Sequence, residues 1–324
     1  MKAVVVSQLG GPEGLKYVEM EKPVPTQHQV LIRVEATSVN FADIKVRYGN
    51  YHGAGQPPFI PGLDVAGTVE AVGENVHRIK VGQRVIAFPK AGSYAEYVVA
   101  DEILTYSISD SLDWDTAAAC PIVSFTSYKL LADVARLEKG ETVLVHAAAG
   151  GVGTTAIQLA KLLGSGTVIG TVGDLAKAEA ALEAGADYVI SYDGFAQSVH
   201  EITKGHGVDV VLDSIGGTVS EQSLTCLAMY GRIANFGNAS GSAGMISTLD
   251  LHSSCRSILG FSLGTTRSKR PQLLQSVADH VFPYLESGQL KMKIGHRFKL
   301  SEAAEAHACM ERRQHTGKII LTVR

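Results

Sequence analysis

The stretch "TVLVHAAAGGVGTTAIQLAK", residues 142–161, holds the pattern that decides the fold. Its first four residues are apolar or β-branched, which favours a buried strand. Three glycines follow within a few residues. The apolar positions after the turn recur at helical spacing: Val152, Ala156, Leu159, Ala160 and Leu163. The stretch therefore predicts a strand, a tight turn and a helix.

The same alternation continues down the chain. Further apolar segments occupy residues 167–173, 188–192, 208–217, 231–237 and 257–264, with helical segments between them. Nearly continuous apolar strands that alternate with helices are typical of a parallel sheet covered on both faces. We predict a Rossmann-type, doubly wound α/β domain over residues 123–265.

The sequence before this domain has a different pattern. Up to about residue 120, short β-branched segments are separated by turns rich in Gly and Pro, which indicates a mostly β, barrel-like domain. A last strand, "KIILTV" (318–323), could return to it. The predicted first domain therefore comprises residues 1–122 and 266–324.

The glycine-rich turn has the position and spacing of a dinucleotide site. In the pattern G-x-G-x-x-G, the glycines allow a tight turn, close approach of the pyrophosphate and close packing of helix on strand. Here these positions hold Ala148, Gly150 and Gly153, so only the first glycine is replaced. The amides at the start of the helix would face the pyrophosphate. The expected cradle consists of Ala149, Gly150, Gly151, Val152 and Gly153.

The end of the second strand predicts which dinucleotide binds. An acidic residue there would bind the ribose 2′-hydroxyl of NADH and repel a 2′-phosphate. The strand instead ends at Val172 and Gly173, and Lys177 follows as a ligand for the 2′-phosphate or as an ordinary surface lysine. We expect Tyr192 to close over the same pocket and NADPH to be preferred; Asp174 is the residue that would oppose this.

Composition excludes several other classes. The 324 residues are 45% hydrophobic and 19% charged, with a net charge of −3, so no basic surface favours nucleic acid as a partner. No apolar run reaches the roughly 20 residues that span a membrane. The four cysteines show no paired spacing, which is typical of a reduced, cytoplasmic protein.

Several further motifs, together with the glycine-rich turn, carry a family resemblance: "VNFADIKVRYGNY" (39–51), "PFIPGLDVAGTVEAVGENV" (58–76), "GSYAEYVVA" (92–100) and "FGNASG" (236–241). In this order they resemble the zinc-independent, zeta-crystallin-like quinone oxidoreductases of the medium-chain dehydrogenase/reductase superfamily. The resemblance covers the whole chain. It implies a GroES-like substrate domain, a Rossmann domain and a homodimer.

Residues at the metal positions of zinc-dependent relatives predict that no zinc is bound. Asn40 stands where those relatives have a cysteine ligand, and Leu63 and Asp64 replace a His–Glu pair. A zinc site needs several such ligands at one point. Without a Lewis acid the expected substrate is one that accepts hydride readily, a quinone or an enone.

The resemblance also implies individual site residues. Asn40, Lys45, Tyr51 and Thr126 match positions near the substrate or nicotinamide. A loop hydrogen bond for Asn40, loop packing for Tyr51 and solvent exposure for Lys45 are the alternatives. Asp43 either lies near the active site or caps a helix. Further expected cofactor residues are Ser214, Gly237, Asn238, Phe261, Leu263 and Arg313. Packing in the core is the alternative for Phe261 and Leu263, and Arg312 is a rival to Arg313.

These features favour an NADPH-dependent quinone reductase. The first alternative is an enone, alkenal or enoyl-thioester reductase with the same fold. An alternative of another class is a non-catalytic NADPH-binding redox sensor or an RNA-binding, crystallin-like protein; the net charge of −3 disfavours RNA.

Overall fold

A six-stranded parallel sheet forms around the stretch that opened the sequence analysis. The computed structural model describes residues 1–51 and 55–324. They divide into a first unit, residues 1–123 and 266–324, and a second unit, residues 124–265. In the second unit the strand order is β10-β9-β8-β11-β12-β13, and every neighbouring pair is parallel. The strands are β8 (Thr142–Val145), β9 (Thr167–Val172), β10 (Tyr188–Ser191), β11 (Val208–Asp213), β12 (Leu227–Asn235) and β13 (Ser257–Gly260).

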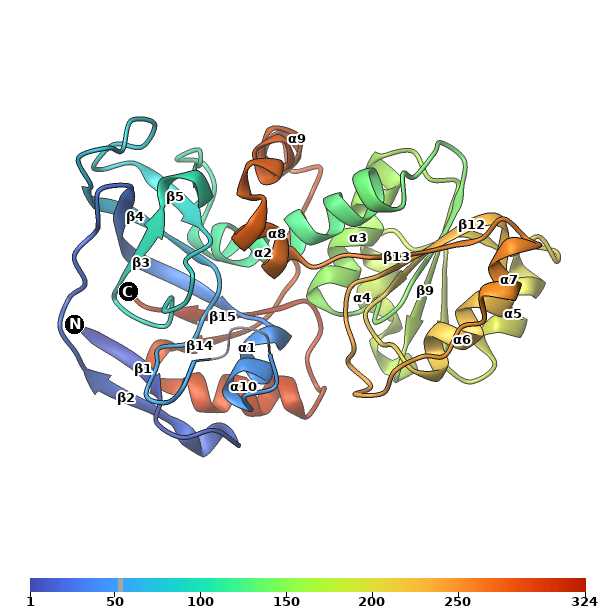
Figure 1. The fold of residues 1–324 in the computed structure, drawn as a ribbon, viewed down its shortest axis with the longest axis horizontal. Coiled ribbons are helices and arrows are strands. Elements are labelled where there is room, and N and C mark those ends of the chain that lie inside the picture. Colours follow the sequence, from blue (N-terminus) through green and yellow to red (C-terminus); the bar gives the residue numbers. More distant parts are fainter. Residues whose placement is uncertain (52–54) are drawn as a thin grey trace. The chain divides into compact units, whose positions relative to one another are not determined.

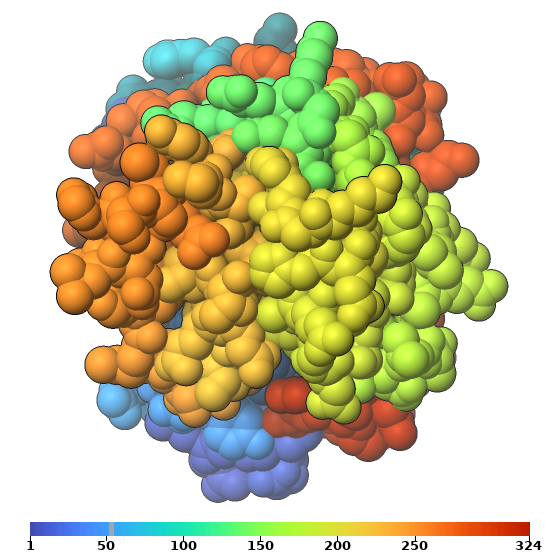
Figure 2. All heavy atoms as spheres, turned by 90° about the vertical axis from the view of Figure 1, so that its right-hand side faces the viewer, coloured from blue at the N-terminus to red at the C-terminus, as the bar shows by residue number. Residues whose placement is uncertain are grey.

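Helices cover both faces of this sheet. Figure 1 shows α3 and α4 on one side of it and α5 and α6 on the other. In Figure 2 the segments coloured yellow to orange, which include α5 to α7, cover the face turned to the viewer. The helical elements are η3 (Lys129–Val134), α3 (Gly151–Leu162), η4 (Leu175–Lys177), α4 (Ala178–Glu183), α5 (Phe195–Ile202), α6 (Thr218–Thr225) and α7 (Thr248–His252). Because both faces are covered, strand residues such as Leu144, Ile169 and Val211 are fully buried.

The first unit is built mainly on antiparallel strands, although β14 and β15 pair in parallel. Its larger sheet has the order β14-β15-β3-β4-β5-β7, with β6 also paired to β3, and β1 pairs with β2 in a small second sheet. The C-terminal strand β15 pairs with β3, so Ile319 lies opposite Val39. The strands are β1 (Lys2–Val6), β2 (Leu15–Glu19), β3 (Gln29–Val39), β4 (Val65–Val72), β5 (Arg84–Ala87), β6 (Tyr97–Asp101), β7 (Thr105–Ser107), β14 (Ile294–Lys299) and β15 (Lys318–Thr322).

Short helices complete this unit. They are η1 (Pro12–Gly14), α1 (Phe41–Arg47), η2 (Glu102–Leu104), η5 (Pro271–Leu274), α9 (Gln275–Glu286), η6 (Leu300–Glu302) and α10 (Ala303–Glu311). Two further helices, α2 (Trp114–Tyr128) and α8 (Leu263–Lys269), contain the points where the chain passes between units. Among the described residues, no helix has the length and apolar content needed to cross a membrane.

Several strands differ in their bounds from the predicted apolar segments: β11 ends at Asp213 rather than at residue 217, and β12 begins at Leu227 rather than at residue 231. The apolar segment 257–264 was expected to be strand throughout, but β13 ends at Gly260 and Leu263 begins α8. The hydroxyl of Ser262 accepts a hydrogen bond from the backbone N–H of Thr265 at 3.1 Å. This cap favours a helix start over a continued strand.

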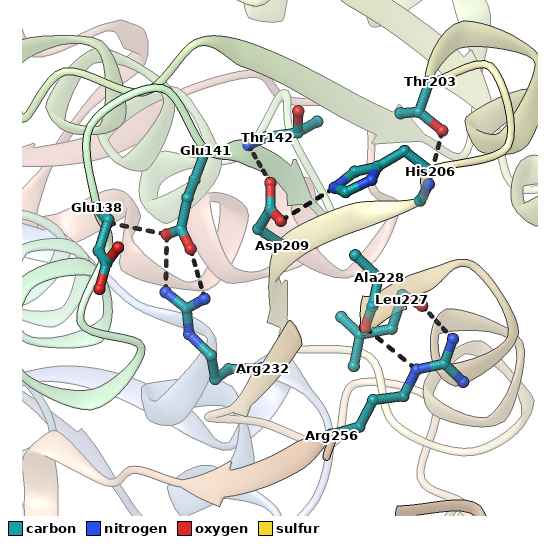
Figure 3. Close-up of polar contacts among 11 residues, drawn as sticks. Glu138, Glu141, Thr142, Thr203, His206, Asp209, Leu227, Ala228, Arg232 and Arg256 are labelled. Atoms are coloured by element: carbon teal, nitrogen blue, oxygen red, sulfur yellow. Dashed lines mark hydrogen bonds and ion pairs between the residues drawn. The ribbon is translucent and has the colours of Figure 1, made fainter. Parts of the chain in front are cut away.

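Arg232 on β12 makes an ionic contact that stabilises the second unit (Figure 3). Its two terminal nitrogens lie 2.6 and 2.7 Å from the two carboxylate oxygens of Glu141, and Nε donates to the carbonyl of Ala135 at 2.8 Å. This contact lowers the pKa of Glu141, and both side chains are largely buried. Planar guanidinium–carboxylate pairs of this kind are strong because both hydrogen bonds are charge-assisted.

We expect Arg232→Lys to lower the free energy of unfolding by about 1–3 kcal/mol, because lysine cannot reproduce the two-pronged contact. Urea denaturation measures this. Arg256→Lys is the matched control, since Arg256 donates only to the carbonyls of Leu227 and Ala228 (Figure 3) and should matter less. The Arg232 effect should shrink as the pH falls through the lowered pKa of Glu141, where the carboxylate loses its charge. Equal losses in both variants would contradict the assignment.

Candidate functional site

The glycine-rich turn connects β8 to α3 with a geometry that only small residues allow. A Cβ atom at Gly153 would lie 2.4 Å from the carbonyl oxygen of Ala147 and 2.6 Å from that of Ala148. Both are backbone atoms that cannot easily move, so glycine is required there. At Gly150 the nearest atom to such a Cβ would be the Ala147 oxygen at 3.3 Å. A side chain at Gly150 would therefore extend into the space outside the turn, whereas one at Gly153 would overlap the backbone of the turn itself.

The structure also explains the alanine at the first glycine position. Ala148 is fully buried, and its backbone N–H donates to the carbonyl of Thr171 on β9 at 2.9 Å. A Cβ added to Gly170 of β9 would lie 2.7 Å from the Cβ of Ala148. The missing side chain of Gly170 thus makes room for the methyl group of Ala148. The left-handed conformation in this turn, φ = 51°, falls on Ala147.

The carboxylate that follows the end of β9 belongs to Asp174, two residues after the strand. The carboxylate of Asp174 accepts a hydrogen bond from the N–H of Ala176 at 2.9 Å and so caps η4. Lys177 is the last residue of η4 and is half-buried, and a Cβ at Gly173 would meet no atom within 4 Å. The end of β9 thus places the exposed helix cap Asp174 beside the open backbone position of Gly173 and the side chain of Lys177.

Tyr192 lies against the turn. Its hydroxyl accepts a hydrogen bond from the N–H of Ala147 at 2.8 Å, and its ring stacks on His146 with centroids 5.7 Å apart. His146 is buried between the hydroxyls of Thr171 (2.7 Å) and Ser223 (2.8 Å), and burial lowers its pKa to about 4. Neutral His146 and Tyr192 together support the strained backbone of Ala147.

The predicted residues after β11 and β12 are brought together. A Cβ at Gly237 would lie 2.8 Å from the carbonyl oxygen of Ser214, which also accepts a hydrogen bond from the N–H of Ala239 at 3.0 Å. Asn238 lies beside Gly216, whose added Cβ would be 3.0 Å from the Asn238 Oδ1. A pocket of about 300 Å³ opens next to them; it is lined in part by Gly216, Asn235, Gly237, Asn238 and Gly260.

Sequence reasoning missed Asp213, which organises this edge of the sheet. It is fully buried at the end of β11, and its Oδ1 accepts from the N–H groups of Ile215 (2.8 Å) and Gly216 (3.1 Å). Its Oδ2 accepts from the Asn235 amide at 3.2 Å and from the Ser220 hydroxyl. An aspartate followed by Ser-Ile-Gly-Gly at a strand end was the available signal.

The remaining predicted site residues lie on several different elements rather than at one strand end. Phe261 is half-buried, and its N–H donates to the carbonyl of Asn235 at 2.9 Å, which ties it to the end of β12. Leu263 is buried at the start of α8, and Thr126 is buried in α2. Arg313 follows α10 in the first unit, where it is exposed with φ = 54°.

In the first unit, Asn40 lies in a buried polar cluster. Its backbone N–H donates to Asp43 Oδ2 at 2.9 Å, and its side-chain Oδ1 accepts from Lys318 Nζ at 2.7 Å. Its Nδ2 donates to the carbonyl and hydroxyl oxygens of Ser38 at 3.5 and 3.4 Å. The Ser38 hydroxyl donates to both carboxylate oxygens of Asp64 at 2.9 Å. A loop hydrogen bond, the alternative role predicted for Asn40, therefore accounts for only some of the hydrogen bonds that Asn40 makes.

Asp43 is both a helix cap and a member of this cluster. It is fully buried, and burial, with a smaller effect of Asp64, raises its pKa to about 7. Tyr94 donates to its Oδ2 at 3.3 Å, and the Tyr94 hydroxyl lies 3.1 Å from Nε2 of His307. No hydrogen-bond partner is found for its Oδ1 among the described residues. The sequence offered no signal for the Tyr94 and His307 contacts.

Lys45 and Tyr51 lie at the edge of this region. Lys45 is half-buried on α1, and its Nζ lies 5.5 Å from the ring centroid of Phe41. Burial raises the pKa of Tyr51, and the positive charge of Arg267 opposes that shift. Arg267 is itself buried, and its guanidinium donates to the carbonyl of Pro89. Within residues 1–51 and 55–324, no three His, Cys, Asp or Glu side chains are grouped so that they could hold a metal ion.

Comparisons with known proteins agree with this architecture. A family model described as "Alcohol dehydrogenase GroES-like domain" matches residues 26–110, and one described as "Zinc-binding dehydrogenase" matches residues 151–279. A quinone oxidoreductase of Pseudomonas aeruginosa is 39% identical over 329 residues, covering 99% of each chain. A 2-haloacrylate reductase of a Burkholderia species is 35% identical over 335 residues, covering 98% of each. The crystal structure of Escherichia coli quinone oxidoreductase complexed with NADPH has a TM-score of 0.93, 32% identity and full coverage of both chains.

The two family models, with the parallel sheet and its glycine-rich turn, define a two-domain oxidoreductase of the medium-chain class. Within that class, the chain belongs to the zinc-independent quinone oxidoreductase family of the medium-chain dehydrogenase/reductase superfamily. The predicted family and fold class are confirmed.

Proposed function

We propose that the protein transfers reducing equivalents from NADPH to a quinone without a metal ion. It is an NADPH-dependent oxidoreductase. The observation that carries the quinone assignment is the chemistry around Asn40: an amide, held by Lys318 and Ser38, stands at the position of a metal-ligating cysteine. Hydrogen-bond donors of this kind stabilise a developing oxyanion but do not polarise an alcohol as a metal does. A substrate that accepts hydride readily suits them best.

All but one of the residues that we assign to the cofactor belong to the second unit; Arg313 belongs to the first. We assign the first-turn amides of α3 to the pyrophosphate, because they have no partner within the helix, and Lys177 and Gly173 to the 2′-phosphate. When bound, NADPH supplies a hydride from its nicotinamide ring. We assign the cofactor site to Ala149, Gly150, Gly151, Val152, Gly153, Val172, Gly173, Lys177, Tyr192, Ser214, Gly237, Asn238, Phe261, Leu263 and Arg313.

Four residues are assigned to the reacting groups. Asn40 donates a hydrogen bond to the substrate oxygen, and Tyr51 supplies a second hydrogen bond or a proton. Lys45 contributes positive charge toward the reduced, anionic product. Thr126 contacts the nicotinamide side. A cytoplasmic homodimer remains our expectation from the family resemblance.

An activated-alkene reductase is the second candidate, because the 2-haloacrylate reductase is almost as similar in sequence as the quinone oxidoreductases. Comparing kcat/KM for 1,4-benzoquinone, 9,10-phenanthrenequinone, acrolein and crotonyl-CoA separates the two. We expect the quinones to be reduced most efficiently. Turnover of crotonyl-CoA alone would reject the quinone assignment, and tight NADPH binding without turnover of any acceptor would favour a sensor.

Lys177→Ala should weaken NADPH binding by about 1–3 kcal/mol, the value of a lost charge-assisted hydrogen bond, and leave NADH binding nearly unchanged. The difference arises because only NADPH carries the 2′-phosphate. Fluorescence titration of wild type and variant with both cofactors measures it. Equal weakening of both cofactors would show that Lys177 supports the fold rather than the phosphate.

A further inference from the structure

Lys318 is a buried cation held beside Asn40. It is the first residue of β15, and the pairing of Ile319 with Val39 places it next to the end of β3. Only 4% of it is exposed. Its Nζ donates to the carbonyl of Val39 at 3.2 Å and to Asn40 Oδ1 at 2.7 Å.

This contact determines which way the Asn40 amide faces. An ammonium group can only donate hydrogen bonds, so the atom that it contacts at 2.7 Å must be the amide oxygen. The amide nitrogen is therefore directed away from Lys318. Its contacts with Ser38, at 3.4 and 3.5 Å, are long, and it also donates toward the carboxylate of Asp64, whose pKa this interaction lowers. The amide nitrogen carries two hydrogens, so one of them can donate to a substrate oxygen.

Buried carboxylates favour the charged form of Lys318. Burial lowers the pKa of Lys318, whereas Asp64 and, to a smaller extent, Asp43 act in the opposite direction. Asp64 is also connected to Asn40 through the hydroxyl of Ser38. Arg267 is a further buried cation whose charge acts on both Asp64 and Asp43. The ammonium thus provides a fixed dipole and charge behind the Asn40 amide, as preorganised groups do in other oxyanion sites.

We propose that Lys318 is a positioning residue, whose ammonium holds Asn40 Oδ1 so that Asn40 Nδ2 donates to the substrate oxygen on which negative charge develops. This inference rests on the proposed function, because it requires Asn40 to contact the substrate. The main alternative is a purely structural ion pair between Lys318 and Asp64.

Lys318→Met tests the proposal, since methionine keeps the length of the side chain without its charge. We expect kcat for 1,4-benzoquinone to fall by about 10- to 100-fold, the usual range for losing oxyanion stabilisation, with the NADPH Kd within about twofold of wild type. Asn40→Ala should cause a similar loss. The double variant should be little slower than either single variant, because both remove one interaction. Additive losses would overturn the proposal. Lys318→Arg, which retains donors and charge, should restore much of the rate.

A second variant addresses folding, because Lys318→Met removes the cation whose charge lowers the pKa of buried Asp64 most. Asp64→Asn combined with Lys318→Met removes both charges and should restore the melting temperature. If Lys318 positions Asn40, turnover stays low in this double variant. Recovery of wild-type turnover would show that the ion pair is structural and would reject the proposal.

A binding readout separates this proposal from the proposed function. The probe is 4-nitrophenolate, a stable anion with a phenolic oxygen, titrated against the full-length protein. Its Kd should rise about tenfold in Lys318→Met and in Asn40→Ala, as expected for one lost charge-assisted contact. An unchanged Kd in both would overturn the role of Lys318. If wild type reduces no quinone yet shows this pattern, the proposed substrate fails while the positioning role stands.

Discussion

Gly153→Ala should lower the free energy of unfolding by about 3 kcal/mol or more, because a Cβ there would overlap two backbone carbonyls. Those oxygens, of Ala147 and Ala148, would lie 2.4 and 2.6 Å from the new methyl group. The strand, the turn and α3 would have to separate to accommodate it. Urea denaturation or thermal unfolding measures the loss.

Gly150→Ala is the matched control in the same turn. The nearest atom to its new Cβ would be the Ala147 carbonyl oxygen at 3.3 Å, a close contact that a small shift relieves, so the loss of stability should be much smaller than for Gly153→Ala. Its methyl group would instead occupy the space through which the pyrophosphate approaches, and we expect the NADPH Kd to rise about tenfold or more. Equal stability of the two variants would contradict the packing role of Gly153. Wild-type NADPH affinity in Gly150→Ala would contradict the placement of the pyrophosphate.

Asp43→Asn should become more stable relative to wild type as the pH rises, by about 3–4 kcal/mol between pH 4 and pH 8, at about 1.36 kcal/mol per pKa unit. The pKa of Asp43 rises from 3.8 in the unfolded chain to about 7 in the folded protein. The folded state therefore binds the proton more tightly, and the contribution of Asp43 is lost as the pH rises through 7. Asparagine has no proton to lose. Urea denaturation of both proteins across this range measures the difference.

Subtracting the wild-type stability from that of Asp43→Asn cancels the contribution that other titrating groups make to the pH dependence of stability. His146 and His307, whose pKa values are lowered to about 4 and about 3, make stability rise with pH in both proteins. Asp187→Asn is a control of opposite sign: contacts with Lys161 and the N–H of Val168 lower the pKa of Asp187, so its stabilisation is lost on acidification. A stability difference for Asp43→Asn that does not change with pH would mean that Asp43 stays ionised in the folded protein.

Much of the second unit could be predicted because its signals are local. The strand at 142–145, the turn and the helix to residue 162 lie within about twenty consecutive residues, where periodicity and glycine spacing act directly. The role of Asp174 was harder to predict from the sequence. Its side chain caps η4, and this depends on how one carboxylate is oriented. The end of β13 was mispredicted for the same reason, because the Ser262 cap competed with an apolar run.

The sequence by itself determined the order of strands and helices, the glycine-rich turn and the residues that stand in place of metal ligands. Only the tertiary structure brought Lys318 to Asn40, 278 residues apart in sequence, and Tyr94 and His307 to Asp43. It also matched Ala148 to Gly170. Periodicity acts between near neighbours in sequence. Pairing of β15 with β3 instead brings Lys318 to Asn40, pairing of β8 with β9 brings Ala148 to Gly170, and packing of α10 against α1 brings His307 near Asp43.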